Sequence, residues 1–207
     1  MDEVIPLPAA SVLLLRDGPL EVLMLRRHEK SSFMPGAWVF PGGIAEKTDM
    51  DMRVTAVRET FEESGIWLGA PLADAEEKRR RLLAGEIAFG ELLAEGPVDL
   101  DQLVPTSRWI TPVGVPKRFD TWFYLAAVSR DVVATAELNE LVDAVWISPP
   151  EALAKHAERS MQIMFPTARN LEALVGFASA AELMESRRGA VIVPIQPVLV
   201  NGKPTLR

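Results

Sequence analysis

Three glutamates that lie close together in the sequence, Glu59, Glu62 and Glu63, form the group best suited to chemistry. If this segment is helical, residues 59 and 63 share a face and residue 62 lies beside them. The acids precede Gly65, and near the C-terminal end of a helix each acid is disfavoured by ~0.3–1 kcal/mol. A hard divalent cation such as Mg²⁺ reverses this penalty, because it binds carboxylate and phosphate oxygens. The three carboxylates are therefore candidate metal ligands for Mg²⁺ or, alternatively, Mn²⁺.

The residues around these acids predict a helix over residues 51–64. Val54, Val57 and Phe61 recur at helical spacing, and Gly65 suits the position that ends a helix. The apolar residues share one side, which places the three acids on roughly the opposite side. A solvated acidic face is the alternative interpretation of such a cluster. A glycine pair before the helix and an arginine beside the acids favour a site.

Residues 42–49 (GGIAEKTD) and 58–66 (RETFEESGI) together resemble the Nudix box. That motif runs Gly, five residues, Glu, seven residues, then Arg-Glu-apolar-x-Glu-Glu-x-Gly-apolar. Asp49 stands where the motif has Glu, eight residues rather than seven then precede the arginine, and Thr60 replaces an apolar residue. Either Asp49 or Glu46 could add a carboxylate from the loop. The matching positions are Gly43, Arg58, Glu59, Glu62, Glu63, Gly65 and Ile66.

The resemblance implies an α+β fold, a Nudix-type α/β/α sandwich with a mixed sheet, and hydrolysis of a diphosphate linkage in a nucleoside diphosphate derivative. It implies metal binding chiefly by Glu59 and Glu63, with Glu62 assisting. Arg58 is expected to orient a catalytic glutamate by ion pairing, so all four residues are candidate catalytic residues. The general base could come from this helix or from a later loop.

Positively charged residues and glycines are the candidates for binding a small diphosphate substrate, because an acidic protein needs local positive charge to attract an anion. Gly42 and Gly43 are expected to form a turn that sets the helix against the sheet. Arg26 and Arg118 are the predicted phosphate contacts, the second because it adjoins Phe119-Asp120-Thr121. The wider group of basic candidates also contains Arg27, Lys30 and Lys117.

Motifs outside the box resemble the Nudix branch that contains the peroxisomal coenzyme A diphosphatases. This resemblance implies coenzyme A or acyl-coenzyme A as substrate. Residues 25–28 (LRRH) are not a clean copy of the coenzyme A signature, so ADP-ribose, other nucleotide sugars and a catalytically silent binding module remain alternatives. The motifs are residues 33–36 (FMPG), 39–43 (VFPGG), 109–112 (WITP), 118–121 (RFDT) and 166–167 (PT).

The remaining sequence predicts sheet interleaved with helices. Residues 9–16 and 21–27 predict a hairpin, and residues 37–40 predict a strand that ends in a glycine loop. Further strands are predicted at 107–113, 119–128 and 142–148, two short helices within 72–96, and helices near 150–158, 167–177 and 180–187. Residues 191–200 contain Pro194 and Pro197, which restrict them to an edge strand or an extended tail.

Composition bounds the function. The 207 residues predict one domain, with a helical insertion at about 71–105 and C-terminal helices at about 150–187. The net charge of −7 argues against nucleic-acid binding, and no run of ~18 apolar residues predicts a membrane span. With no cysteine and two histidines, any metal must be held mostly by oxygen. We expect a cytoplasmic protein, and family analogy leaves a homodimer open.

Overall fold

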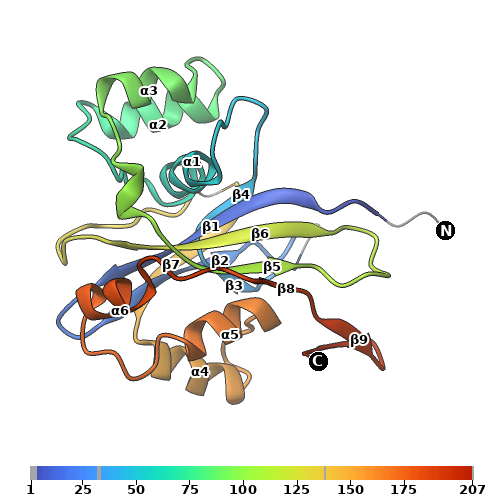
Figure 1. Ribbon diagram of the computed structural model, residues 1–207. Coiled ribbons are helices and arrows are strands. Elements are labelled where there is room, and N and C mark those ends of the chain that lie inside the picture. Colours follow the sequence, from blue (N-terminus) through green and yellow to red (C-terminus); the bar gives the residue numbers. More distant parts are fainter. Residues whose placement is uncertain (1–3, 32–33, 138, 207) are drawn as a thin grey trace.

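The computed structural model describes residues 4–31, 34–137 and 139–206 and shows an α/β/α sandwich (Figure 1). Its strands are β1 (Leu7–Arg16), β2 (Glu21–Arg27), β3 (Trp38–Val39), β4 (Gly42–Ile44), β5 (Val104–Ile110), β6 (Phe119–Ala127), β7 (Leu141–Ile147), β8 (Pro194–Ile195), β9 (Val198–Val200) and β10 (Lys203–Thr205). Its helices are α1 (Met52–Ser64), α2 (Ala75–Leu83), α3 (Phe89–Glu95), α4 (Pro149–Ala157), α5 (Phe165–Glu172) and α6 (Ala180–Arg187), with a 3₁₀ turn at Leu100–Gln102.

The main sheet is mixed, as predicted. Its strand order in the described chain is β3-β2-β1-β6-β5-β8, while β4 pairs with β1 and β7 pairs with β2. β1 runs parallel to β6 and antiparallel to β2 and β4. β2 meets β1 at Leu15 and Arg16, and β4 meets the same edge of β1 at Ala9, Ala10 and Ser11. One edge of β1 is therefore shared by two strands, one of which leads into α1.

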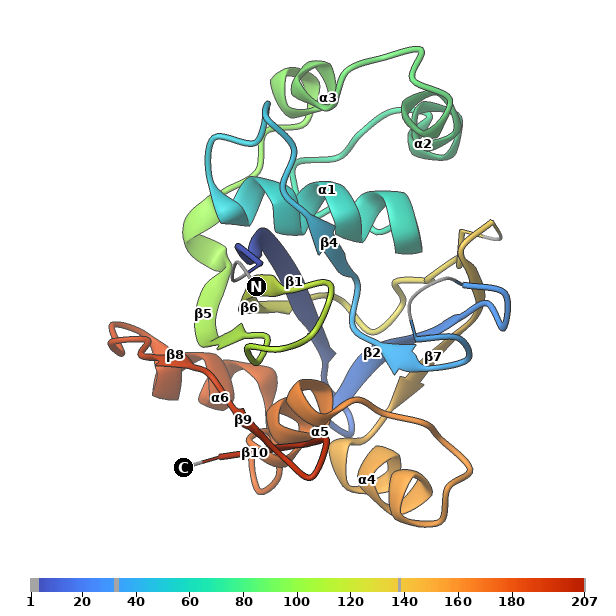
Figure 2. The ribbon, with the colours of Figure 1, turned by 90° about the vertical axis from the view of Figure 1, so that its right-hand side faces the viewer.

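Helices cover both faces of the sheet, with α1, α2 and α3 on one side and α4, α5 and α6 on the other (Figures 1 and 2). Val12 and Leu14 pack with α1, whereas Leu13 and Leu15 pack with the opposite helices. This explains the continuous apolar run in β1, because a strand covered on both faces has no solvent-facing positions. The two cores hold the sheet fixed between α1 and the C-terminal helices.

Most predicted elements are confirmed within a few residues. α1 begins after Asp51, whose side chain accepts the backbone N–H of Arg53, and it ends at Gly65 in the left-handed conformation (φ 73°). The two helices predicted within residues 72–96 are α2 and α3. α5 spans Phe165–Glu172 and is shorter than predicted.

Two predictions about irregular segments were wrong or incomplete. Gly42 and Gly43 do not form a loop but belong to β4, where a Cβ on Gly42 would lie 2.4 Å from the backbone oxygen of Ala10. The C-terminal segment provides the predicted edge strand, β8, but then forms a hairpin of β9 and β10. Its turn residues, Asn201 (φ 51°) and Gly202 (φ 76°), have the positive φ values of a tight hairpin turn. Residue 33 of the 33–36 motif lies outside the described residues.

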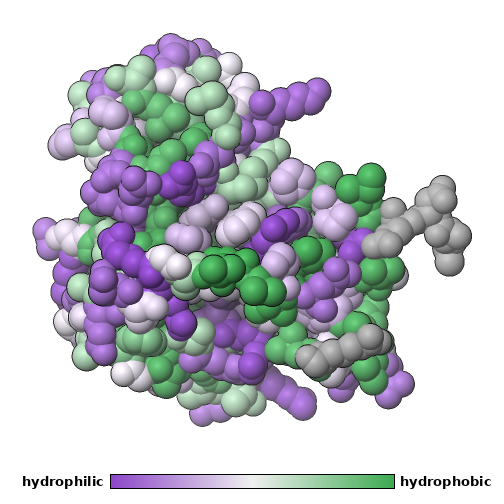
Figure 3. Space-filling model, viewed as in Figure 1, coloured by the Kyte–Doolittle hydropathy of each residue, from purple (hydrophilic) through white to green (hydrophobic). Residues whose placement is uncertain are grey.

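Apolar side chains gather at one end of the molecule, near the start of β1, the β5–β6 turn and the C-terminal hairpin (Figure 3). The exposed hydrophobic residues there are Val4, Ile5, Val113, Leu199 and Val200. In the part of the chain that the structure describes, no helix has the length and apolar character needed to cross a membrane.

Candidate active site

The acids of α1 lie against β4 instead of in bulk solvent, which argues against the alternative of a solvated acidic face. Glu63 is 7% exposed, and its carboxylate accepts the backbone N–H of Gly42 at 2.9 Å. The side chains of Glu59 and Glu62 are 14% and 20% exposed. Figure 2 shows β4 running beside α1. The three carboxylates therefore lie between the helix and the strand rather than in bulk solvent.

Gly43 allows this close approach. A Cβ at this position would lie 2.4 Å from Oε1 of Glu59, a distance that real Cβ atoms do not reach. The glycine pair therefore positions the acids by the absence of side chains and not by making a turn.

Arg58 connects the carboxylates to the loop before the helix. Its Nη1 donates to Glu59 at 2.9 Å and to Glu62 at 3.0 Å, and its Nη2 donates to Asp49 at 2.9 Å and to the carbonyl oxygen of Ile44 at 3.0 Å. The guanidinium is buried, so these charge-assisted bonds fix the two glutamates in place. This geometry supports a positioning role for Arg58.

The structure distinguishes the two loop acids. Asp49 is 2% exposed at its side chain, where it pairs with Arg58 and accepts bonds from the Thr55 hydroxyl and the Glu46 backbone N–H. Burial opposes its ionisation, but the hydrogen bonds from Arg58 and Glu46 lower the pKa of Asp49. Glu46 is 59% exposed and lies 3.8 Å from Arg58. Asp49 is therefore used in a buried pair with Arg58, whereas Glu46 is exposed at the edge of the cleft.

Burial disfavours the ionised form of all three glutamates. Burial raises the pKa of Glu59 to about 7, although Arg58 opposes the shift. Burial and the charge of Glu59 raise the pKa of Glu63 to about 8. Burial also raises the pKa of Glu62. A nearby cation would favour the ionised form of all three.

This donor set fits a hard divalent cation in atom type and in charge. Among the described residues, no three acidic or imidazole side chains are already gathered as a metal cage, and Arg58 contacts two of the carboxylates. The three candidate ligands named by the sequence line one cleft, and a bound cation would favour their ionised form.

That cleft has a volume of about 680 Å³ and extends from α1 across β4 to β6. Arg27 and Lys117 line it and provide positive charge near the acids. Phe119, Thr121 and Phe123 of β6 form part of its wall, and Thr167 comes from α5. The cleft is large enough for part of a nucleotide, and the part lined by the glutamates, Arg27 and Lys117 is polar.

The structure does not place either predicted phosphate-binding arginine in the cleft. Arg26 pairs with Glu29 at 2.5 Å on a partly exposed surface and does not line the cleft. Arg118 is buried, and its guanidinium donates to the backbone oxygens of Thr111 and Val4. Their neighbours Arg27 and Lys117 occupy the cleft instead. For Arg27 a signal was present, because Leu23, Leu25 and residue 27 alternate onto the α1 face of β2.

Two further residues at the site were missed. Glu140 lines the cleft, and its charge adds to the raised pKa values of Glu59 and Glu63. Arg79 of α2 donates to the backbone oxygen of Glu62 through Nε at 3.0 Å and Nη2 at 2.7 Å. Nothing in the sequence signals Arg79, because it lies in a basic run that reads as a solvated helix face.

Comparison with known proteins assigns the class. The sequence model described as the NUDT19 Nudix domain matches residues 48–174, more than half of the chain. A crystal structure of a NUDIX hydrolase from Alicyclobacillus acidocaldarius superposes with a TM-score of 0.79 at 28% identity, covering 88% of this chain and 96% of that one. The chain belongs to the Nudix hydrolase family.

Within that family, the chain is similar to proteins named acyl-coenzyme A diphosphatase and to a further nudix hydrolase. The chicken protein named acyl-coenzyme A diphosphatase NUDT19 is 28% identical over 84% of this chain and 69% of its own length. Putative nudix hydrolase 7 of Caenorhabditis elegans is 35% identical over 70% of this chain and 52% of its own length. The chain thus matches between about half and seven tenths of the length of these relatives.

Proposed function

We propose that this protein is a divalent-cation-dependent hydrolase that cleaves a diphosphate linkage in a nucleotide derivative, with coenzyme A or acyl-coenzyme A as the first substrates to test. The observation that carries the proposal is the convergence of one buried and two partly buried carboxylates with Arg27 and Lys117 in one cleft. Acidic side chains that hold a cation and positively charged side chains that neutralise phosphate groups both favour diphosphate hydrolysis. The names of the relatives support the choice of substrate.

Glu59, Glu62 and Glu63 would hold Mg²⁺ or Mn²⁺, which polarises the diphosphate and lowers the pKa of a bound water. Arg58 keeps Glu59 and Glu62 in place, and Asp49 keeps Arg58 in place. Arg27 and Lys117 attract the substrate, which offsets the overall negative charge of the protein. Phe119 and Phe123 give part of the cleft an apolar wall against which an organic moiety can pack.

The direct test incubates the protein with coenzyme A, an acyl-coenzyme A and ADP-ribose, each with Mg²⁺, with Mn²⁺ and with EDTA, and identifies products by mass. We expect metal-dependent release of a nucleoside phosphate from one of the first two compounds. Cleavage of ADP-ribose alone would contradict coenzyme A as the substrate and would identify a nucleotide-sugar hydrolase. Ligand binding without products under any metal would identify a silent binding module.

Glu63→Gln is the matching variant. We expect turnover to fall by a factor on the order of 10² or more, because the amide cannot supply the negative charge for a divalent cation. Retained circular dichroism and melting temperature show that the fold is intact. Glu76→Gln, an exposed change on α2, is the control. Activity within about threefold of wild type in Glu63→Gln would contradict the role of this carboxylate.

A further inference from the structure

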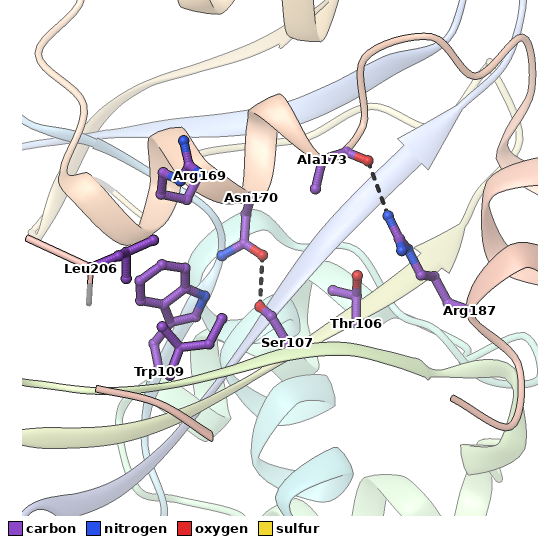
Figure 4. A pocket seen from close by; sticks show the side chains of 9 residues that line it. Thr106, Ser107, Trp109, Arg169, Asn170, Ala173, Arg187 and Leu206 are labelled. Atoms are coloured by element: carbon purple, nitrogen blue, oxygen red, sulfur yellow. Dashed lines mark hydrogen bonds between the residues drawn. The ribbon is translucent and has the colours of Figure 1, made fainter. Parts of the chain in front are cut away.

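A second cavity lies on the face of the sheet away from α1 and shares no lining residue with the cleft. Its volume is about 220 Å³, and it is formed by β5, α5, the end of α6 and the C-terminal segment (Figure 4). Its lining residues are Thr106, Ser107, Trp109, Arg169, Asn170, Ala173, Arg187, Ile195 and Leu206.

The first unusual feature of this cavity is unsatisfied hydrogen-bond donors. Within the described chain, three buried side-chain nitrogens have no hydrogen-bond partner, and two of them, Trp109 Nε1 and Arg187 Nε, belong to residues that line this cavity. Trp109 is 6% exposed, and Figure 4 shows the nitrogen-bearing edge of its indole turned toward Ser107 and Asn170. A buried donor without an acceptor is unfavourable, so two at one place call for an acceptor.

The second feature is charge. Arg169 and Arg187 line the cavity, and no carboxylate is among its described lining residues, although the protein carries a net charge of −7. Arg169 pairs with Glu172 outside the cavity. Arg187 forms no ion pair within the described residues; its Nη2 donates to the backbone oxygen of Ala173 at 3.3 Å.

The third feature is a fixed polar floor between these donors. The Ser107 hydroxyl donates to Oδ1 of Asn170 at 2.7 Å, and Nδ2 of Asn170 donates to the backbone oxygen of Pro166 at 2.9 Å. In Figure 4 this pair lies between Trp109 and Arg187. The walls therefore need little rearrangement to receive an acceptor group.

We propose that this cavity binds a small organic anion whose carboxylate or phosphate oxygens accept from Trp109 Nε1 and Arg187 Nε. The size of the cavity limits the ligand to a compact molecule, smaller than the nucleotide derivative proposed for the cleft. The site is independent of the proposed hydrolysis, because the two cavities share no residue. α5 contributes to both, with Thr167 in the cleft and Arg169, Asn170 and Ala173 here.

The test uses ¹⁵N-labelled full chain titrated with inorganic phosphate and, separately, with succinate. The indole N–H resonance of Trp109, identified by its loss in Trp109→Phe, reports the site locally, because Trp109 lines this cavity and not the cleft. We expect it to shift in a saturable manner with at least one of the two probes. Phosphate and succinate distinguish the two sources of the oxyanion, and a response to either supports the site.

Arg187→Met should weaken that binding about tenfold or more, whereas Arg188→Met should leave it unchanged. Arg188→Met is the matched control, because this substitution removes the same charge at the neighbouring residue. Arg188 pairs with Glu185 at 3.2 Å and does not line the cavity. If Trp109→Phe does not fold, calorimetric titration of the two arginine variants with the same probes gives the answer. An unmoved Trp109 resonance with both probes, or equal affinity in both arginine variants, would overturn the proposal.

Discussion

Alternation along β2 decides which of two adjacent arginines reaches the cleft. Leu23 and Leu25 pack with α1, so Arg27 continues that face, whereas Arg26 points to the other side and pairs with Glu29. In the loop before β6, Lys117 lines the cleft whereas the adjacent Arg118 is buried. At the residue scale, strand register therefore decides which arginine of β2 reaches the cleft.

Arg27→Met is therefore expected to raise KM for a diphosphate substrate about tenfold, because a charge-assisted contact contributes ~1.5–3 kcal/mol to binding. The melting temperature should change little. Steady-state kinetics of Arg26→Met is the matched comparison, and it should resemble wild type. Equal effects of the two substitutions would count against the assignment of Arg27.

The three candidate carboxylate ligands could be predicted from the sequence, because residue type and spacing are enough to recognise them. Glu59, Glu62 and Glu63 meet in one cleft as the resemblance implied. Their burial could not be predicted from the sequence, because it depends on β4 passing alongside α1. The two predicted phosphate contacts, Arg26 and Arg118, do not line the cleft, since the sequence alone does not state which way a basic side chain faces in the fold.

At the scale of elements, the site depends on how closely β4 and α2 approach α1. β4 contributes the Gly42 N–H to Glu63, and α2 contributes the Arg79 guanidinium to the backbone oxygen of Glu62. The last turn of α1 is thus held from both sides, one of which is the helical segment that follows the Nudix box.

Gly43→Ala should reduce turnover by about tenfold or more, because the added methyl group displaces the Glu59 carboxylate from its present position. Gly90→Ala in α3 is the control, since its Cβ would meet nothing within 4 Å. That control should retain full activity and gain up to about 1 kcal/mol of stability. Kinetics and chemical denaturation measure both effects, and an active Gly43→Ala would show that Glu59 tolerates displacement.

Arg79→Ala should lower the free energy of unfolding by about 1–3 kcal/mol, because it leaves the Glu62 carbonyl oxygen without its buried partner. Arg80→Ala removes an exposed ion pair with Glu77 and should change the free energy of unfolding by less than about 1 kcal/mol. Urea denaturation compares the two. Similar losses would mean that Arg79 acts only as a surface residue.

The regular elements followed from periodicity and caps, whereas the irregular ones required tertiary information. Asp51 and Gly65 mark both ends of α1 in the sequence. Gly42 and Gly43 read as a loop because glycine is rare within strands. The neighbours that require glycine are distant in the sequence: Ala10 and Ser11 of β1 for Gly42, and Glu59 of α1 for Gly43. The β9–β10 hairpin had a local signal, Asn201-Gly202, which the surrounding prolines obscured.

At the scale of the whole molecule, the acidic site links stability to pH and to cations. Burial raises the pKa of Glu59 to about 7 and of Glu63 to about 8, from an ordinary value of 4.5. The folded state therefore holds more protons than the unfolded chain between these values. Consequently, the free energy of unfolding falls as pH rises from 4.5 toward 8.

In EDTA, the melting temperature should therefore decrease across this range, and saturating Mg²⁺ should reduce the decrease because it binds the ionised glutamates. Calorimetry at several pH values measures the effect. Glu63→Gln should flatten the profile in EDTA. A melting temperature that rises with pH in wild type, or that ignores Mg²⁺ throughout, would contradict the proposed linkage.

The parallel pairing of β1 with β6, from Leu7 with Phe119 to Leu15 with Ala127, joins segments more than a hundred residues apart. During synthesis, the ribosome releases the apolar β1 strand long before its partner exists. Until Ala127 has emerged, one edge of the strand beneath α1 stays open to wrong partners. Contacts of such long range also slow refolding. Translation speed and chaperone capacity should therefore govern the yield of this protein in a cell.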